Sequence, residues 1–350
     1  MGTQSERGMY MDFQFRALTD IWTGGVEGKP NKLHVTGIKG SIRWWYETIM
    51  RGLDKYACDP RNLDKSNTCL FEKAHAVSGL SLCEQTKATL CPACYMFGCT
   101  GWSGKFNVAV RLLDGNKYGP LITNQIRAND SFVICLIERK VLEPAERTLL
   151  RMTMQLIAEY GAIGAKTVFK PSEIRAKNTK LHHRDFGIIT TSPIINLPVE
   201  RNLLVQVNEY LKDFPRTSDQ NDRVWPDLRN FWFMKGAHIN RAQHNSIVGR
   251  DENGRYTPNP SDKQAFLGGF IGREKGVFQG PVRSEYANTN AASKKVFSFR
   301  GSKAGDAVER CFGYTRRGEL DDFVKLLKTV MPAISQQDVV MGDRLLEIKD

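Results

Sequence analysis

Residues 33–51, LHVTGIKGSIRWWYETIMR, contain the clearest structural pattern in the chain. Large apolar side chains recur there at intervals of four, three and four residues, at Ile38, Ile42, Trp45 and Ile49. This spacing predicts a helix over residues 38–51 with one buried face. Lys39, Arg43 and Glu47 fall on another face of the same helix.

The segments around this helix predict an α+β fold. Residues 9–19, MYMDFQFRALT, alternate apolar and polar side chains, as a half-buried strand does. Strands are also expected over residues 106–113 and 130–138, a helix over residues 144–160, and a last strand within FGIITTSPIINL, residues 186–197. Strand, helix, strand, strand, helix, strand is the order of a ferredoxin-like or RRM-like unit.

The second half of the chain has a weaker pattern. Residues 202–214 predict an amphipathic helix, and a second helix near the C-terminus is predicted by the apolar stripe Leu320, Phe323, Leu327 and Val330. Between them, residues 241–290 are rich in Gly, Pro and Asn and poor in apolar residues. We therefore predict a long loop there, and such loops in compact proteins are usually functional or disordered.

Length and composition fit a soluble globular protein with room for two domains. The chain has 350 residues, of which 41% are hydrophobic and 25% are charged, and its mean hydropathy is −0.40. No window approaches the roughly 18 consecutive apolar residues that a membrane-spanning helix needs, and residues 1–15 lack the apolar core of a secretion signal. We therefore expect a cytoplasmic protein with no membrane partner.

Positive charge is concentrated in two segments. The net charge is +12, from 50 Lys and Arg against 38 Asp and Glu. Residues 161–184 hold six cations against one acid, and residues 231–303 hold twelve against five, so these segments account for the whole excess. Localised positive charge is typical of proteins that bind a polyanion such as nucleic acid. A solvated basic surface is the alternative interpretation.

Six of the eight cysteines lie within residues 58–99, in otherwise polar sequence. Cys91-Pro-Ala-Cys94 is a CxxC pair, whose spacing lets both sulfurs contact one tetrahedral metal ion. Cys58 and Cys69 lie in turn-rich stretches and are the expected second pair. We therefore predict a structural zinc ion bound by these four cysteines.

Alternatives to this ligand set remain open. Cys83 and His75 are the other residues that can complete the site. A redox CxxC is the weaker interpretation, because no thioredoxin-like βαβ pattern surrounds the motif. A catalytic zinc is not expected, since no HExxH or HxE pattern accompanies the cluster.

Three glycine-containing segments, residues 33–47, 160–170 and 267–283, combine backbone freedom with nearby cations. Phosphate can approach free amides at a helix start, and aromatic and cationic side chains on a glycine-rich backbone suit single-stranded nucleic acid. The RNA-binding residues that we predict in these segments are Lys39, Arg43, Trp44, Lys166, Lys170, Arg273, Lys275 and Arg283. For each segment an ordinary tight turn or helix cap is the alternative, and for Trp44 it is core packing.

Two motifs together carry a family resemblance. GIKGSIRWWYE, residues 37–47, is preceded by Thr23-Gly24-Gly25 and followed by CPACYMFGCTGWSGKF, residues 91–106. This combination resembles the RAMP superfamily of CRISPR effector subunits, in which a strand, a glycine loop and a GxxGxxRW helix start are followed by CxxCxLFG. The doubled tryptophan and the run FGCTGW are most similar to the first, double-domain RAMP subunit of the type III-B Cmr complex. The resemblance spans about residues 13–110.

The resemblance implies two RRM-like RAMP domains. The N-terminal domain is expected over residues 8–192, with a zinc-stabilised insertion at about residues 54–100, and the C-terminal domain over residues 193–350, with the long basic glycine-rich loop. The family further implies a non-catalytic, RNA-binding subunit of a ribonucleoprotein. Such a subunit caps the filament near the 3′ end of the guide RNA and contacts target RNA and neighbouring RAMP subunits.

An endoribonuclease acting on target or precursor RNA is the alternative function. Family members that cut RNA carry an aspartate just after the N-terminal glycines. The corresponding loop, TGGVEGKP at residues 23–30, has Glu27 near that position and Asp20 before it. One carboxylate without a partner base is weak support for general acid–base catalysis. A zinc-stabilised scaffold without RNA contact is a third interpretation.

Overall fold

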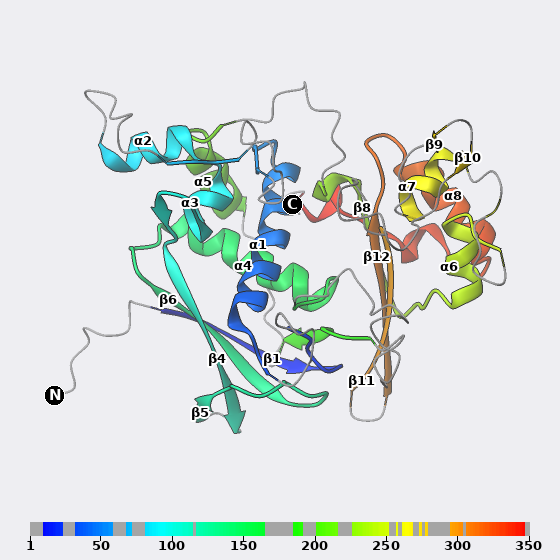
Figure 1. Cartoon of the computed structure of the whole chain (residues 1–350), viewed down its shortest axis with the longest axis horizontal. Coiled ribbons are helices and arrows are strands. Elements are labelled where there is room, and N and C mark those ends of the chain that lie inside the picture. Colours follow the sequence, from blue (N-terminus) through cyan, green and yellow to red (C-terminus); the bar gives the residue numbers. More distant parts are fainter. Residues whose placement is uncertain are drawn as a thin grey trace. The chain divides into compact units, whose positions relative to one another are not determined.

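In the computed structural model, the chain divides into two compact units, each with its own sheet (Figure 1). The first unit comprises Met1–Ala165, Gly187–Asp227 and Leu346–Asp350, and the second comprises Lys166–Phe186 and Leu228–Leu345. The structure describes residues 10–23, 32–58, 68–71, 81–114, 117–164, 185–191, 201–215, 226–251, 257, 261–268, 273–274, 277–278, 295–303 and 306–346.

A five-stranded antiparallel sheet in the order β5-β4-β6-β1-β7 forms the first unit. Its strands in chain order are β1 (Tyr10–Ala17), β4 (Phe106–Asp114), β5 (Lys117–Leu121), β6 (Ser131–Glu138) and β7 (Ile189–Thr191). Alternate side chains of β1 are buried, as the strand pattern predicts. Helices α1 (Val35–Gly52) and α4 (Pro144–Glu159) pack against each other and against strands of this sheet.

Shorter elements complete the first unit. They are α2 (Leu82–Thr89), α3 (Pro92–Phe97), the hairpin of β2 (Gly98–Cys99) and β3 (Trp102–Ser103), and α5 (Arg201–Leu211). Helix α3 contacts α1, and α5 contacts α4. None of the described helices has the length and apolar character needed to cross a membrane.

Helix α1 buries the predicted apolar face. Its four stripe residues, Ile38, Ile42, Trp45 and Ile49, are at most 1% exposed. The indole nitrogen of Trp45 donates to the carbonyl of Ala162 at 2.9 Å, which fixes this ring inside the core. The helix begins at Val35 rather than at the predicted residue 38, because the first turn already closes with the Gly37 amide donating to the His34 carbonyl.

A buried carboxylate joins α4 to the start of β4 and to α5. Glu146 is fully buried, and both of its carboxylate oxygens accept from the ammonium of Lys105 at 2.7 Å. The Tyr210 hydroxyl also donates to Glu146, at 2.6 Å. Because an unpaired buried charge is strongly destabilising, these contacts fix the three elements together.

The second unit repeats the strand order of the first. Its four-stranded antiparallel sheet runs β11-β12-β8-β13, as β4-β6-β1-β7 does in the first unit. The strands are β8 (Phe231–Lys235), β11 (Val296–Lys303), β12 (Asp306–Tyr314) and β13 (Val340–Met341). The helices are α6 (Arg241–Ile247), α7 (Asp262–Gly268) and α8 (Leu320–Val330). A hairpin of β9 (Arg273–Glu274) and β10 (Val277–Phe278) and the short 3₁₀ helices η3 (Leu228–Asn230), η5 (Gln336–Asp338) and η6 (Asp343–Leu345) complete this unit.

The mixed α+β fold and each predicted helix and strand are confirmed within the described residues, but the predicted loop over residues 241–290 is partly wrong. Helices α6 and α7 and the β9–β10 hairpin lie in that range. Capping residues start both helices despite the low apolar content. Asn240 and Gln243 form a reciprocal capping box before α6, and Ser261 and Gln264 exchange similar hydrogen bonds before α7.

Gly161 lies directly against the core tryptophan of α1. A Cβ atom at this position would lie 2.5 Å from Cζ2 and 2.8 Å from Cε2 of Trp45. We expect Gly161→Ala to lower the free energy of unfolding by about 1–3 kcal/mol, because overpacking a closed core forces side chains off their preferred rotamers. Denaturant unfolding of the two proteins measures the difference, and an unchanged midpoint would contradict this packing of Trp45.

Candidate metal centre

Four cysteine thiols of the first unit converge on one point. The sulfurs of Cys58, Cys69, Cys91 and Cys94 all lie within 4.8 Å of one another. The Cys58 sulfur lies 3.3 Å from that of Cys94 and 3.9 Å from that of Cys91. Four sulfurs at about 2.3 Å from a tetrahedral ion are about 3.8 Å apart. The cluster therefore has the size and the donor set of a metal–thiolate site.

The CxxC motif is shaped by the start of α3. Cys91 is the N-cap of this helix and Pro92 occupies its first turn, where proline's missing amide is not needed. The Cys94 amide donates to the Cys91 sulfur at 3.4 Å, and the Cys91 amide donates to the Cys69 sulfur at 3.3 Å. Backbone N–H groups thus point at sulfurs, an arrangement that favours negative charge on them.

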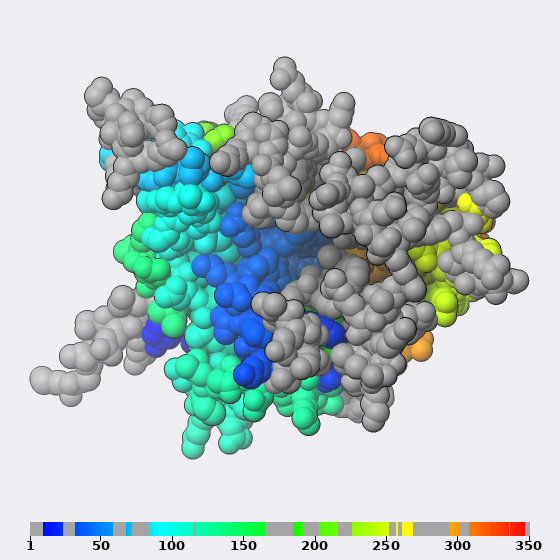
Figure 2. All heavy atoms as spheres, viewed as in Figure 1, coloured from blue at the N-terminus to red at the C-terminus, as the bar shows by residue number. Residues whose placement is uncertain are grey.

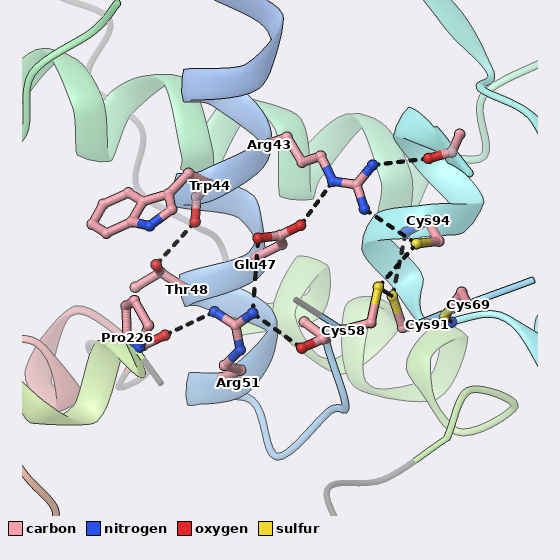
Figure 3. Close-up of polar contacts among 12 residues, drawn as sticks. Arg43, Trp44, Glu47, Thr48, Arg51, Cys58, Cys69, Cys91, Cys94 and Pro226 are labelled. Atoms are coloured by element: carbon pink, nitrogen blue, oxygen red, sulfur yellow. Dashed lines mark hydrogen bonds and ion pairs between the residues drawn. The ribbon is translucent and has the colours of Figure 1, made fainter. Parts of the chain in front are cut away.

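Helix α1 contacts the cluster through Arg43 (Figure 3). The guanidinium of Arg43 donates to the Cys94 sulfur at 3.2 Å, to the Gly98 carbonyl at 2.8 Å and to the Glu47 carboxylate at 2.7 Å. Burial opposes the positive charge, but Glu47 and the Cys94 sulfur outweigh it and raise the pKa of Arg43. Arg43 therefore remains a cation beside the sulfurs.

Glu47 links Arg43 to Arg51, which contacts the backbone next to Cys58. Its carboxylate lies 3.8 Å from the guanidinium of Arg51, which donates to the carbonyls of Ala57 at 3.0 Å and Pro226 at 3.1 Å. Ala57 directly precedes the metal-ligand candidate Cys58. A chain of buried and half-buried polar groups thus supports the backbone on both sides of the cysteine cluster.

Proton affinities differ among the four thiols. Burial raises the pKa of Cys91. Hydrogen bonds from the neighbouring thiols of Cys69, Cys91 and Cys94 lower the pKa of Cys58. A metal ion bound by these sulfurs would displace the thiol protons, because thiolates are the ligand form of cysteine.

The four predicted ligands are brought together, and the two alternatives lie outside the described contacts. His75 belongs to residues 72–80, which are not described, and Cys83 lies in α2, where its side chain is not described. The described part of the cluster offers four sulfurs, enough to close a tetrahedral site. Closed four-coordinate sites are structural rather than catalytic, because they leave no position for water or substrate.

Of the predicted RNA-binding residues, three are on α1. The ammonium of Lys39 is half-buried and donates to the Phe106 carbonyl at 3.3 Å. Arg43 is engaged with Glu47, Gly98 and Cys94 as above. The ring of Trp44 is half-buried and packs edge-on against Trp45, with centroids 4.7 Å apart.

The other predicted RNA-binding residues are outside the described side chains. Lys166, Lys170, Lys275 and Arg283 belong to undescribed segments, and for Arg273 only the strand backbone is described. Packing explains two glycines of the 160–170 segment. Gly161 faces Trp45, and Gly164 has a φ of +112°, with the Trp22 carbonyl oxygen 2.5 Å from where a Cβ atom would lie.

The carboxylates proposed for RNA cleavage do not form a described pair. Asp20 accepts a hydrogen bond from the Ala128 amide at 2.9 Å, and its own carbonyl accepts from Gly187. Glu27 lies in residues 24–31, which are not described. The contacts of Asp20 are those of a loop anchor.

Sequence reasoning missed Glu47 and Arg51 as supports of the cluster, although their spacing from Arg43 was a usable signal. Residues four apart on a helix are neighbours, so opposite charges at positions 43, 47 and 51 can pair along one face. What the spacing does not indicate is that this face is buried and leads to the cysteines.

A family comparison covers the region that holds this site. Residues 14–169 match the RAMP superfamily. The predicted resemblance is thereby confirmed over this range, which we call the RAMP region. It includes the second half of β1, all of α1 and α4, and the four cysteines. No curated protein matches the chain significantly.

Two solved structures are similar to the whole chain at low sequence identity. One is Cmr1 from Pyrococcus furiosus in its apo form, with a TM-score of 0.44, 12% identity, and coverage of 95% of this chain and 98% of that chain. The other is a chain of the type III-B Cmr-beta complex bound to cognate target RNA, with a TM-score of 0.42, 10% identity, and coverage of 93% and 100%.

The metal centre in the RAMP region is open to a direct test. We expect about one metal ion per chain, and Cys91→Ser should lose it, because a hydroxyl is a poor replacement for a thiolate ligand. Cys135→Ser is the matched control, since Cys135 lies on β6 outside the cluster. Metal analysis of protein prepared without chelator provides the measurement, and equal metal content in wild type and Cys91→Ser would contradict the site.

Proposed function

We propose that this protein is a non-catalytic, RNA-binding subunit of a type III-B CRISPR ribonucleoprotein. In this proposal it caps the filament near the 3′ end of the guide RNA, helps to bind target RNA, and contacts neighbouring RAMP subunits. The observation that carries the proposal is the match of residues 14–169 to the RAMP superfamily. The GIKGSIRWWYE and CPACYMFG motifs within that range support the assignment to the double-domain Cmr subunit.

The proposal also covers the fold of the two domains, the identity of the metal ion and the cellular location. We take residues 8–192 and 193–350 as two ferredoxin-like RAMP domains, supported by the strand order that the two sheets share. We take zinc as the ion in the four-cysteine cluster, because a site with four cysteine ligands is a usual structural zinc site. A cytoplasmic location agrees with free thiols.

The exposed side of α1 at Gly40 leaves room for a ligand backbone to lie close to the helix. Gly40 is exposed, and a Cβ atom there would have no neighbour of the described chain within 4 Å. Glycine inside a helix costs about 1 kcal/mol relative to alanine. No contact within the described chain explains why this position is glycine. A ligand backbone lying close against α1 would explain it, because only glycine has no side chain in the way. In Figure 2 the blue segment of the chain, which includes α1, forms part of the visible surface.

RNA binding that depends on phosphate contacts has a defined salt dependence. The logarithm of affinity should fall linearly with the logarithm of salt concentration, by about 0.7 per phosphate contact for a single strand. Five or six contacts therefore predict a slope of roughly −4. Fluorescence anisotropy with a labelled single-stranded RNA gives this slope, and salt-independent affinity would favour the scaffold without RNA contact.

The same RNA distinguishes the proposed function from an endoribonuclease. We expect the labelled RNA to remain intact with wild type and with Glu27→Ala. Cleavage by wild type that disappears in Glu27→Ala would establish the enzyme instead.

Replacing Gly40 tests whether RNA lies against α1. Gly40→Ala should raise the free energy of unfolding by about 0.5–1 kcal/mol through helix propensity and at the same time weaken RNA binding. Asn208→Ala, at an exposed position of α5, is the matched control, because it also improves helix propensity but should leave RNA affinity unchanged. RNA affinity of Gly40→Ala equal to that of wild type would contradict the close approach.

A further inference from the structure

Two cations meet where α1 reaches the end of the sheet. The Lys39 ammonium donates to the Phe106 carbonyl at 3.3 Å and lies 5.5 Å from the centroid of the Phe106 ring. The Arg139 amide donates to the carbonyl of Lys105, the residue before Phe106, at 2.7 Å. Phe106 is also paired with Glu138 across β4 and β6, so Arg139 follows directly from that pair. Lys39 and Arg139 are therefore held at the same corner of the RAMP region.

The described residues provide no counter-ion for this pair. Neither Lys39 nor Arg139 forms an ion pair with a described carboxylate, although the carboxylates around them do form such pairs. Glu138 pairs with Arg147 at 2.5 Å and accepts from the Leu142 amide, Glu146 is engaged by Lys105, and Glu47 by Arg43. The corner thus has unbalanced positive charge.

The positive charge of Lys39 has an electrostatic cost. Burial, together with the like charges of Arg43 and Arg139, lowers its pKa. The ammonium has three donors, and among described residues one carbonyl accepts from them. A bound anion would supply the missing acceptors and would remove the like-charge repulsion.

We infer that Lys39 and Arg139 form a phosphate-binding site, and that a phosphodiester group of single-stranded RNA occupies it. The RNA occupant rests on the proposed function; the anion site rests on the two side chains. Arg139 is exposed and can offer two parallel N–H donors to phosphate oxygens, while Lys39 contributes a point charge from the side of α1.

A phosphodiester fits this corner better than a carboxylate of a partner protein. Gly40 follows Lys39 in α1 and leaves the helix backbone open on the outer side, where a sugar-phosphate chain can lie. The net charge of +12 also attracts a polyanion over a longer range than it attracts a single acidic side chain.

The test compares RNA binding by wild type, Arg139→Gln, Lys39→Gln and the double variant. With a labelled single-stranded oligoribonucleotide, each single substitution should make the salt slope shallower by about 0.7, and the double substitution by about 1.4. Arg151→Gln removes the same charge from an exposed position of α4 and should leave the slope at the wild-type value. A double variant with the wild-type slope would overturn the RNA assignment.

A second probe separates the site from the proposed function. Inorganic tripolyphosphate should raise the Tm of wild type and of Arg151→Gln, and this rise should be lost in the double variant. If wild type binds no RNA but shows this pattern, the anion site is supported and the proposed function fails. If the rise in Tm is equal in all proteins, the site is overturned. Arg139→Gln alone decides the result if Lys39→Gln does not fold, because the Arg139 side chain is exposed.

Discussion

The buried carboxylate of Glu47 is the contact on which the surroundings of the four-cysteine cluster depend. It lies between the guanidinium groups of Arg43 and Arg51, all three on α1. A buried carboxylate without cations would be strongly destabilising, as would the buried guanidinium of Arg51 without a carboxylate. The three charges therefore hold one another in place, and their remaining donors are directed to fixed acceptors. These acceptors are the Cys94 sulfur and Gly98 carbonyl on one side and the Ala57 and Pro226 carbonyls on the other.

This arrangement gives α1 two different sides. One side is the apolar stripe, which fixes the helix to the core through residues such as Trp45. The other side is the row of charges that reaches the cysteines. Gly40 lies one turn before Arg43 on this second side, and a Cβ atom there would have no neighbour of the described chain within 4 Å. The packed stripe holds the helix in place, so the backbone at Gly40 is a preformed surface that requires little ordering when a ligand binds.

The sequence predicted those parts of the structure that local patterns specify. The apolar stripe of α1 and the alternation in β1 follow from periodicity, and the four clustered cysteines follow from a CxxC motif beside two further cysteines. The contact of Arg43 with the Cys94 sulfur could not be predicted. A helical repeat shows that positions 39, 43 and 47 share a face, but it does not show which residues pack on that face. Arg139 was missed for a similar reason. Its proximity to Lys39 arises from two contacts together: Lys39 donates to Phe106 at the start of β4, and β4 pairs with β6, which Arg139 follows. Residues a hundred positions apart thereby lie close together.

The position of Arg43 also determines how the metal centre and the cationic corner influence each other. A divalent ion bound by four thiolates carries a net charge of about −2, which alone would repel a nearby phosphate. Arg43 contacts the Cys94 sulfur directly and lies one helical turn from Lys39. Its positive charge therefore acts on both the Cys94 sulfur and Lys39. Because Glu47 keeps Arg43 in this orientation, the same ion pair that supports the cysteine ligands also limits their repulsion of an anion on the outer side of α1.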